Sequence, residues 1–398
     1  MVNYYELGAD KRLCDIVIAG SHDAGITKGK SNVQTQIDNL FQQALNGIRV
    51  FDLRIAATMK PGAPIQLKSF HADPILMSNS TSKGTVWGGA NTDKRKLTTT
   101  TLMGGAFGEK LVDLLVQAKN FVTFVQGSEF LILKFDKCTN WAAIAEVCVK
   151  QLGEEVIFTG TGSLNEKTLE QLKNKVVVLF SEKGRLEARQ AGYGVEQGIL
   201  GWMNITDEAM FYSKLYDGLQ YIGKGGTNPL DGKSDGGKME ANIKKQGGLM
   251  SKGADAFVDP EVMGMMYWTT TGLNRSIQER DMKMWADSSP LTKLWTQGLK
   301  DAIESRLLPH MNMTNYSTGP DLKAFMPNII MIDFADHHKG KFVRDLNTTA
   351  STMLTKAAID EKALLDLSAN YTNTRRKYQL NNNNNNNNRN NNNNNNNG

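Results

Sequence analysis

The chain has 398 residues, which is enough for one large domain or two ordinary ones, and its 40% hydrophobic and 22% charged content is ordinary for a soluble globular enzyme. The formal net charge of +5 favours contact with phosphate-bearing surfaces, but it is too small and too spread out to indicate nucleic acid. No stretch approaches the roughly 18 apolar residues of a membrane span. The polar N-terminus lacks the apolar core of a signal peptide, so we expect a cytoplasmic protein with peripheral membrane contact at most.

The composition changes abruptly near the C-terminus. From residue 381 onward the chain is asparagine, interrupted only by Arg389 and ended by Gly398. Such a segment has no apolar side chains to bury, so the sequence predicts a disordered tail over 379–398. We expect a single globular domain over 1–378, with a catalytic core at about 13–345.

Polar, reactive side chains follow two short apolar runs in the first part of the chain. The run beginning at Ile16 ends at His22 and Asp23, and the run 47–53 ends at Arg54. Apolar runs rich in β-branched residues are typical of buried parallel strands. Between them, 32–46 carries apolar residues at helical spacing. The pattern predicts strand, helix and strand, with the three polar side chains on one side of a sheet.

The remaining chain alternates between predicted strands and helices. Residues 65–71 alternate like an edge strand ending in His71, whereas 78–106, rich in Ser, Thr, Gly and Asn, predicts a long loop. The other predicted strands are 130–136, 176–182, 263–271 and 328–336, and the other predicted helices are 107–124, 141–152, 290–307 and 350–367.

Six or seven strands separated by helices, without a Gly-x-Gly-x-x-Gly or Walker motif, predict a (β/α) barrel rather than a nucleotide-binding open sheet. The positions of the polar residues favour the same fold, because the carboxyl ends of barrel strands converge on one site. The side chains predicted at such ends are His22, Arg54, His71, Lys134, Glu182, Thr269 and Asp333.

Two histidines with neighbouring carboxylates and an arginine suit phosphoryl transfer by paired acid and base. One imidazole takes a proton from the attacking oxygen, and the other gives a proton to the leaving oxygen. A guanidinium can hold the non-bridging phosphate oxygens and neutralise charge in the transition state. The chain has only five histidines, which makes His22 and His71 the candidates at strand ends.

The segments 19–25, 47–54 and 70–71 resemble the X-domain of phosphatidylinositol-specific phospholipases C. The resemblance implies a distorted, incomplete (β/α)8 TIM-type barrel that cleaves a phospholipid, expected to be phosphatidylinositol. It implies that His22 is the general base and His71 the general acid, that Arg54 binds the phosphate, and that Asp23 orients a catalytic histidine.

The resemblance also requires a carboxylate from a late strand, for which Asp333 is the first choice and Asp336 the second. The residues expected to bind substrate are Lys134, Glu182 and Trp268, although a strand-end lysine is often a solvated rim residue and a tryptophan is often core. We expect a monomer whose partner is a phospholipid headgroup at a membrane surface.

The same resemblance predicts catalysis without a metal or other cofactor. Calcium-dependent members of the family carry an asparagine after the first histidine and an acidic pair after the second strand. Here Asp23 follows the histidine, and Arg54 stands where a ligand would lie, so its fixed charge would repel a cation.

Two alternatives remain open. The triplet Asp336-His337-His338 is the signature of the DHH phosphoesterases, manganese enzymes of a different fold. The second alternative is a non-catalytic barrel that binds inositol phospholipid headgroups.

Overall fold

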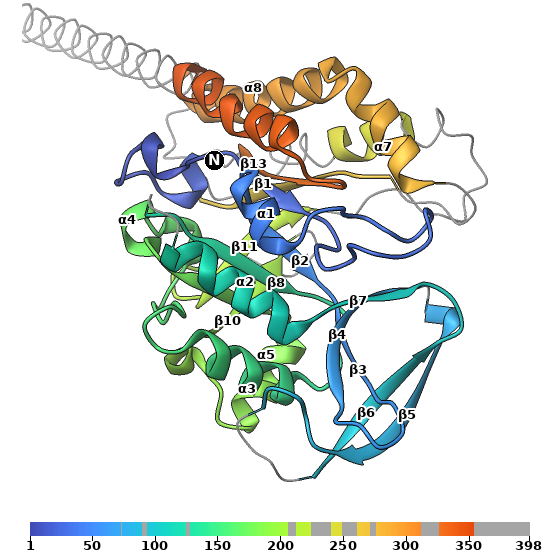
Figure 1. Ribbon diagram of the computed structural model, residues 1–398. Helices are drawn as coiled ribbons and strands as arrows, with labels where there is room; N and C mark the ends of the chain where they lie inside the picture. Colours follow the sequence, from blue (N-terminus) through green and yellow to red (C-terminus); the bar gives the residue numbers. More distant parts are fainter. Residues whose placement is uncertain are drawn as a thin grey trace, which may run out of the picture.

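Eight parallel strands form a closed ring at the centre of the molecule (Figure 1). The ring closes because β1, the first strand of the barrel, pairs in parallel with both β2, the second, and β13, the last. The predicted TIM-type fold class is confirmed, but the ring is complete, whereas the resemblance implied an incomplete one. In ring order the strands are β1 (Ile18–Ser21), β13 (Met326–Ile332), β12 (Met263–Trp268), β11 (Gly218–Gly223), β10 (Ile199–Asn204), β9 (Val176–Phe180), β8 (Leu131–Phe135) and β2 (Ile48–Leu53).

The structure is a computed structural model, and the residues it describes are 1–72, 74–89, 94–124, 128–205, 212–223, 240–248, 261–270, 276–311 and 326–353. The predicted domain end at 378 and the predicted asparagine tail lie outside the described residues. So does most of the helix predicted over 350–367, from residue 354 onward.

The barrel strands are continuous apolar runs because both of their faces are buried. In β9, Val176, Val178 and Phe180 pack against the surrounding helices, while Val177 and Leu179 pack inside the ring. The helices that cover the barrel are α1 (Leu40–Leu45), α2 (Leu111–Phe124), α3 (Trp141–Leu152), α4 (Leu169–Leu172), α5 (Glu182–Gln190), α7 (Ile277–Ala286), α8 (Ser289–Met311) and a C-terminal helix over 337–353. Within the described part of the chain, none of them is long and apolar enough to cross a bilayer.

The helix predicted over 32–46 is wrong in its first half. Only Leu40–Leu45 is helical, and Asn39 caps it by accepting a hydrogen bond from the backbone N–H of Gln42. The preceding residues instead bond to the strand ends: the hydroxyl of Thr35 donates to the carbonyl of Asp23, and the side-chain amide of Gln36 donates to the carbonyl of His22. These tertiary hydrogen bonds hold the segment against the barrel mouth in a conformation that its helical spacing did not predict.

The loop predicted over 78–106 is also wrong, because most of it is a β-hairpin. Strand β5 (Met77–Gly84) pairs antiparallel with β6 (Arg95–Leu102) over their whole length. Serine and threonine face each other along the hairpin, and threonine fits a half-exposed strand as well as it fits a polar loop. The hairpin belongs to a five-stranded side sheet with β3 (Ile55–Thr58), β4 (Gln66–His71) and β7 (Ala106–Lys110), seen beside the barrel in Figure 1.

Candidate active site

The polar residues that follow β1, β2 and β13 meet at one end of the barrel. His22 and Asp23 come directly after β1, Arg54 directly after β2, and Asp333 directly after β13. Neighbouring parallel strands end at the same edge, so these four side chains are brought together by the topology alone. The convergence expected from the sequence therefore holds for these residues.

His22 is buried and is held by a carboxylate through one ring nitrogen. Its Nδ1 lies 2.9 Å from Oδ1 of Asp333, and the two residues are 6% and 0% exposed. The ring also meets the edge of Tyr267, with the ring centroids 6.0 Å apart. An Nδ1–H that donates to Asp333 leaves Nε2 as the nitrogen that can exchange a proton with a substrate.

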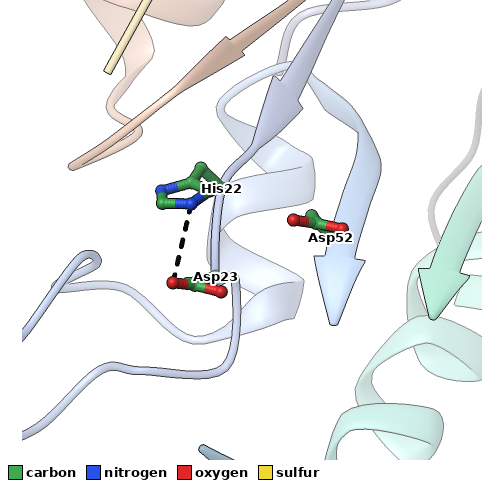
Figure 2. Close-up of side chains that lie close together, drawn as sticks. All are labelled: His22, Asp23 and Asp52. Carbon is green, nitrogen blue, oxygen red and sulfur yellow. Dashed lines mark ion pairs between the residues drawn. The ribbon is translucent and has the colours of Figure 1, made fainter. Parts of the chain in front are cut away.

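Asp23 is the centre of the cluster, because its two oxygens meet three cationic or protonatable groups. Oδ2 lies 2.5 Å from Nδ1 of His71 and 3.6 Å from Nε2 of His22, and Oδ1 lies 3.1 Å from Nε of Arg54. Figure 2 shows Asp23 and His22 facing each other at the end of β1. Burial alone would raise the pKa of this carboxyl, but Arg54 and the two imidazoles outweigh it and hold the pKa of Asp23 well below its usual range.

His71 reaches the site from the side sheet and not from the barrel. It is the last residue of β4, where it lies opposite Ala106 of β7. Its side chain is 21% exposed, compared with 7% for His22. The prediction that His71 ends a barrel strand is therefore wrong, although its strand does deliver it to Asp23. One imidazole lies deep in the site and the other lies nearer its opening.

The surroundings of His22 favour its charged form. Burial by itself would lower the pKa of the imidazole, but the carboxylates of Asp23 and Asp333 raise the pKa of His22 to about 9, against a smaller opposing effect of Arg54. The imidazole therefore carries a proton near neutral pH when no substrate is bound.

This shift predicts a pH-dependent stability. The folded-state pKa of about 9 exceeds the ordinary value of 6.5, so the folded protein binds the extra proton. The resulting stabilisation, about 3 kcal/mol, is fully present below pH 6.5 and is lost as the pH rises to about 9. Urea unfolding at pH 6.5, 7.5 and 9 measures it, with His22→Gln as the control that lacks the group. Equal losses of stability in the two proteins over this range would contradict the prediction.

A second ion pair, between Lys134 and Asp52, lies next to the pair formed by Arg54 and Asp23. Nζ of Lys134 in β8 is 3.0 Å from Oδ1 of Asp52 in β2, and it lies 4.3 Å from the ring centroid of Trp202. Burial alone would lower the pKa of Lys134, but Asp52 and its other neighbours hold that pKa well above its usual value. Lys134 is 1% exposed, so it is a buried cation at the base of the site and not a solvated rim residue.

Three other predicted site residues lie elsewhere. Asp336 is exposed and accepts a hydrogen bond from the backbone N–H of Lys339 at the start of the helix 337–353, so Asp333 is the carboxylate that pairs with His22. Glu182 is exposed at the start of α5 and forms an ion pair with Arg185. Trp268 is fully buried in the apolar layer between the barrel and its helices, as a core residue would be.

Two contributors to the site were not predicted from the sequence. Tyr267 packs against His22 from the end of β12, and Gln36 joins the carbonyl of His22 to the backbone N–H of Ala335. The position of Tyr267 near the end of a predicted strand was an available signal. No sequence signal marks Gln36, because its role depends on the irregular path of 26–39.

One group of possible metal ligands occurs among the described residues. One ligand atom from each of His22, Asp23 and Asp52 lies within 4.8 Å of the others (Figure 2). Their charges are already compensated, since Asp23 pairs with Arg54 and Asp52 pairs with Lys134. A divalent ion would have to displace the partly exposed Arg54 and the buried Lys134, so this set of donors fits a resident metal poorly.

The fold and the site together define a TIM-type barrel with two carboxylate-paired histidines at its mouth. Solved structures similar to this chain are bacterial phospholipases. A phosphatidylinositol-specific phospholipase C from Staphylococcus aureus is 12% identical with a TM-score of 0.44, over 85% of this chain and 95% of that chain. A second structure of that enzyme is 13% identical with a TM-score of 0.45 over the same shares.

A calcium-dependent phosphoinositol-specific phospholipase C from a Pseudomonas species is 13% identical with a TM-score of 0.36, over 65% of this chain and 83% of that chain. No family model and no curated protein matches the sequence. These comparisons assign no family to the chain, so the function is argued from the site itself.

Proposed function

We propose that the protein is a phosphodiesterase of the phospholipase C type, which cleaves an inositol phospholipid by paired-histidine catalysis. The observation that carries the proposal is the arrangement around Asp23. A single buried carboxylate contacts His71 and Arg54, while a second carboxylate, Asp333, holds His22. Two separately oriented imidazoles and one guanidinium around Asp23 support a paired acid and base with a phosphate-binding group, which suits in-line displacement at phosphorus.

In the proposed reaction, Nε2 of neutral His22 takes the proton of the inositol 2-hydroxyl, whose oxygen attacks the phosphorus. The bond from phosphorus to the diacylglycerol oxygen breaks, and Nε2 of His71 donates the proton that this oxygen receives. The products are a cyclic inositol phosphate and diacylglycerol. Arg54 neutralises the charge that grows on the non-bridging oxygens, and Lys134 adds positive potential from below.

The protonated state of His22 has a consequence for this mechanism. Because the pKa of His22 is raised to about 9, only a small fraction of the imidazole is neutral at pH 7 in the free protein. The acid limb of kcat/KM should therefore lie well above pH 6.5, since it reports ionisation of the free enzyme.

An apolar edge beside the site supports a lipid substrate. Ile75 and Met103 are 76% and 69% exposed, which is unusual for large apolar side chains. They lie together, because the backbone N–H of Met103 donates to the carbonyl of Leu76 at 2.8 Å. Ile75 lies a few residues after His71, the last residue of β4, and Met103 lies a few residues before Ala106, the first residue of β7. His71 and Ala106 pair with each other, so both apolar side chains flank strand ends at the site.

Basic side chains adjoin this apolar edge. Lys28 and Lys30 are exposed in the loop that follows Asp23, and Gly29 between them lies against Ala106. Apolar groups that can enter a bilayer and lysines that attract anionic headgroups are the two components of peripheral membrane binding. We therefore propose that this face meets an anionic phospholipid surface.

The proposal is tested by assaying water-soluble products from a panel of phosphodiesters in vesicles and in solution, with and without EDTA. We expect cleavage of phosphatidylinositol in vesicles, release of a cyclic phosphate, and unchanged activity in EDTA. Phosphatidylcholine vesicles are the control, because their headgroup has no hydroxyl next to the phosphoester.

Two results would contradict the proposal. Activity that EDTA abolishes and Mn²⁺ restores would indicate a metal enzyme, although the DHH fold itself is excluded by the closed barrel. Binding to phosphatidylinositol vesicles without turnover of any phosphodiester, unchanged in His22→Ala, would indicate a non-catalytic headgroup-binding module.

A further inference from the structure

Lys339 is a buried lysine under the turn that carries Asp333. It is 5% exposed, and its Nζ donates to the backbone carbonyls of Asp333 and Phe334, each at 2.9 Å. The third partner of the ammonium is the carboxylate of Asp281 on α7, which is also buried. An ammonium group has three protons, so each has a partner in this arrangement.

Two helices fix the position of this ammonium. Asp336 begins the helix 337–353, and the backbone N–H that it caps is that of Lys339 itself, so the lysine stands in the first turn directly after the strand end. On α7, Asp281 and Trp285 are one turn apart and lie on the same face. The ring centroid of Trp285 lies 5.4 Å from Nζ.

The turn above Lys339 adopts a conformation that needs such support. Phe334 has a φ of 45°, in the left-handed region that bulky residues avoid because it strains the backbone. Its backbone N–H donates to the carbonyl of Thr35, and its own carbonyl points to Lys339. Without Lys339, two carbonyls would lose a charged donor in a buried place, and the turn would gain freedom to relax.

We infer that Lys339 is a positioning residue of the site, which fixes the Asp333–Phe334 turn and thereby holds the Asp333 carboxylate against Nδ1 of His22. The Lys339 ammonium contacts Asp281, Asp333, Phe334 and Trp285 rather than an imidazole, so it acts through Asp333. Its role in turnover rests on the proposed function, whereas its effect on His22 does not.

Loss of the Lys339 charge and loss of its positioning effect would shift the pKa of His22 in opposite directions. The inference can therefore be tested. The charged groups that act on His22 are Asp23, Asp333 and Arg54. Removal of a nearby positive charge would by itself raise the pKa of His22, because the imidazolium would be repelled less. Release of Asp333 from its position would instead lower that pKa, because the imidazolium would lose a hydrogen-bonded anion.

The test variant is Lys339→Met/Asp281→Leu. It replaces a buried ion pair with apolar groups, which proteins often tolerate. Burial raises the pKa of Asp281 to about 7, so above that pH the variant removes one charge of each sign and leaves the net charge unchanged. The matched control is Lys341→Met/Asp345→Leu, which makes the same replacements at an exposed ion pair on the same helix. Asp333→Asn gives the value of the His22 pKa expected when the carboxylate is lost altogether.

The first readout is an NMR titration of His22 in each folded variant, without substrate. We expect the proton affinity of His22 to fall about tenfold in the test variant, toward its value in Asp333→Asn, and to stay unchanged in the control. The second readout is the pH profile of turnover, where the plateau of kcat should fall about tenfold, KM should stay within about twofold, and the acid limb should move to lower pH.

An unchanged or increased proton affinity of His22 in the folded test variant would overturn the inference. If that variant does not fold, Lys339→Gln/Asp281→Asn retains a polar pair, and the same two readouts decide. Because the titration requires no turnover, a lowered His22 pKa in a protein that cleaves no phosphodiester would support the positioning role and refute the proposed function.

Discussion

A His71→Ala protein is expected to cleave its natural phospholipid diester about 100- to 10,000-fold more slowly than the unaltered protein. The physical reason is the leaving group, because an alkoxide of diacylglycerol is a strong base and needs a proton as it departs. With a nitrophenolate leaving group, which departs readily without a proton, the loss should be small. The measurement is kcat for both substrates at one pH, compared between His71→Ala and His22→Ala.

His22→Ala is the informative comparison, because loss of the base should slow both substrates alike. His338→Ala is the matched control, since His338 is exposed at the start of the last described helix and should be dispensable. Full activity of His71→Ala on the natural diester would refute its role as the acid. If kcat of His71→Ala fell equally on both substrates, His71 would act before the leaving group departs.

Arg54→Lys should lower kcat by about 100-fold or more, with a smaller effect on KM. Burial alone would lower the pKa of the guanidinium, but Asp23 and Asp52 hold the pKa of Arg54 above its usual range, so it remains charged at every working pH. A lysine would keep the charge and lose the planar fork that matches two phosphate oxygens and one carboxylate. The loss should appear in kcat because charge on those oxygens grows toward the transition state.

Arg12→Lys is the control for this substitution. Arg12 likewise pairs with a carboxylate, through two hydrogen bonds to Asp15, but it lies before β1 at the opposite end of the barrel strands. Its replacement should leave kcat unchanged. An Arg54→Lys protein with wild-type kcat would mean that point charge suffices and that Arg54 does not recognise the phosphate bidentately.

The sequence predicts six of the eight barrel strands, because burial on both faces leaves a strong signal, but it does not predict β10 and β11. The apolar runs around β8 and β9 are interpreted only as buried strands. The polar residues that end β1, β2 and β13 are predicted to meet, because parallel barrel strands end at the same edge. It also predicts Asp333 ahead of Asp336, because only Asp333 directly follows the apolar run.

The failures occur where tertiary contacts decide the conformation. The segment before α1 has helical spacing but is held by hydrogen bonds from Thr35 and Gln36, and no local pattern encodes such partners. The serine and threonine residues of the hairpin β5–β6 suit a loop and an exposed strand equally. The sequence predicts that Glu182 ends a strand, but that strand, β9, ends at Phe180. Glu182 is instead the first residue of α5.

The two imidazoles come from different parts of the architecture, one from the barrel and one from the side sheet. Small displacements of the sheet relative to the barrel would therefore change the geometry of bond breaking while leaving that of attack intact. Solvent viscosity or a cross-link between the sheet and the barrel would then act selectively on departure of the leaving group. In the proposed reaction, departure of the leaving group would then be mechanically separable from attack, which it would not be in a site built wholly on one ring of strands.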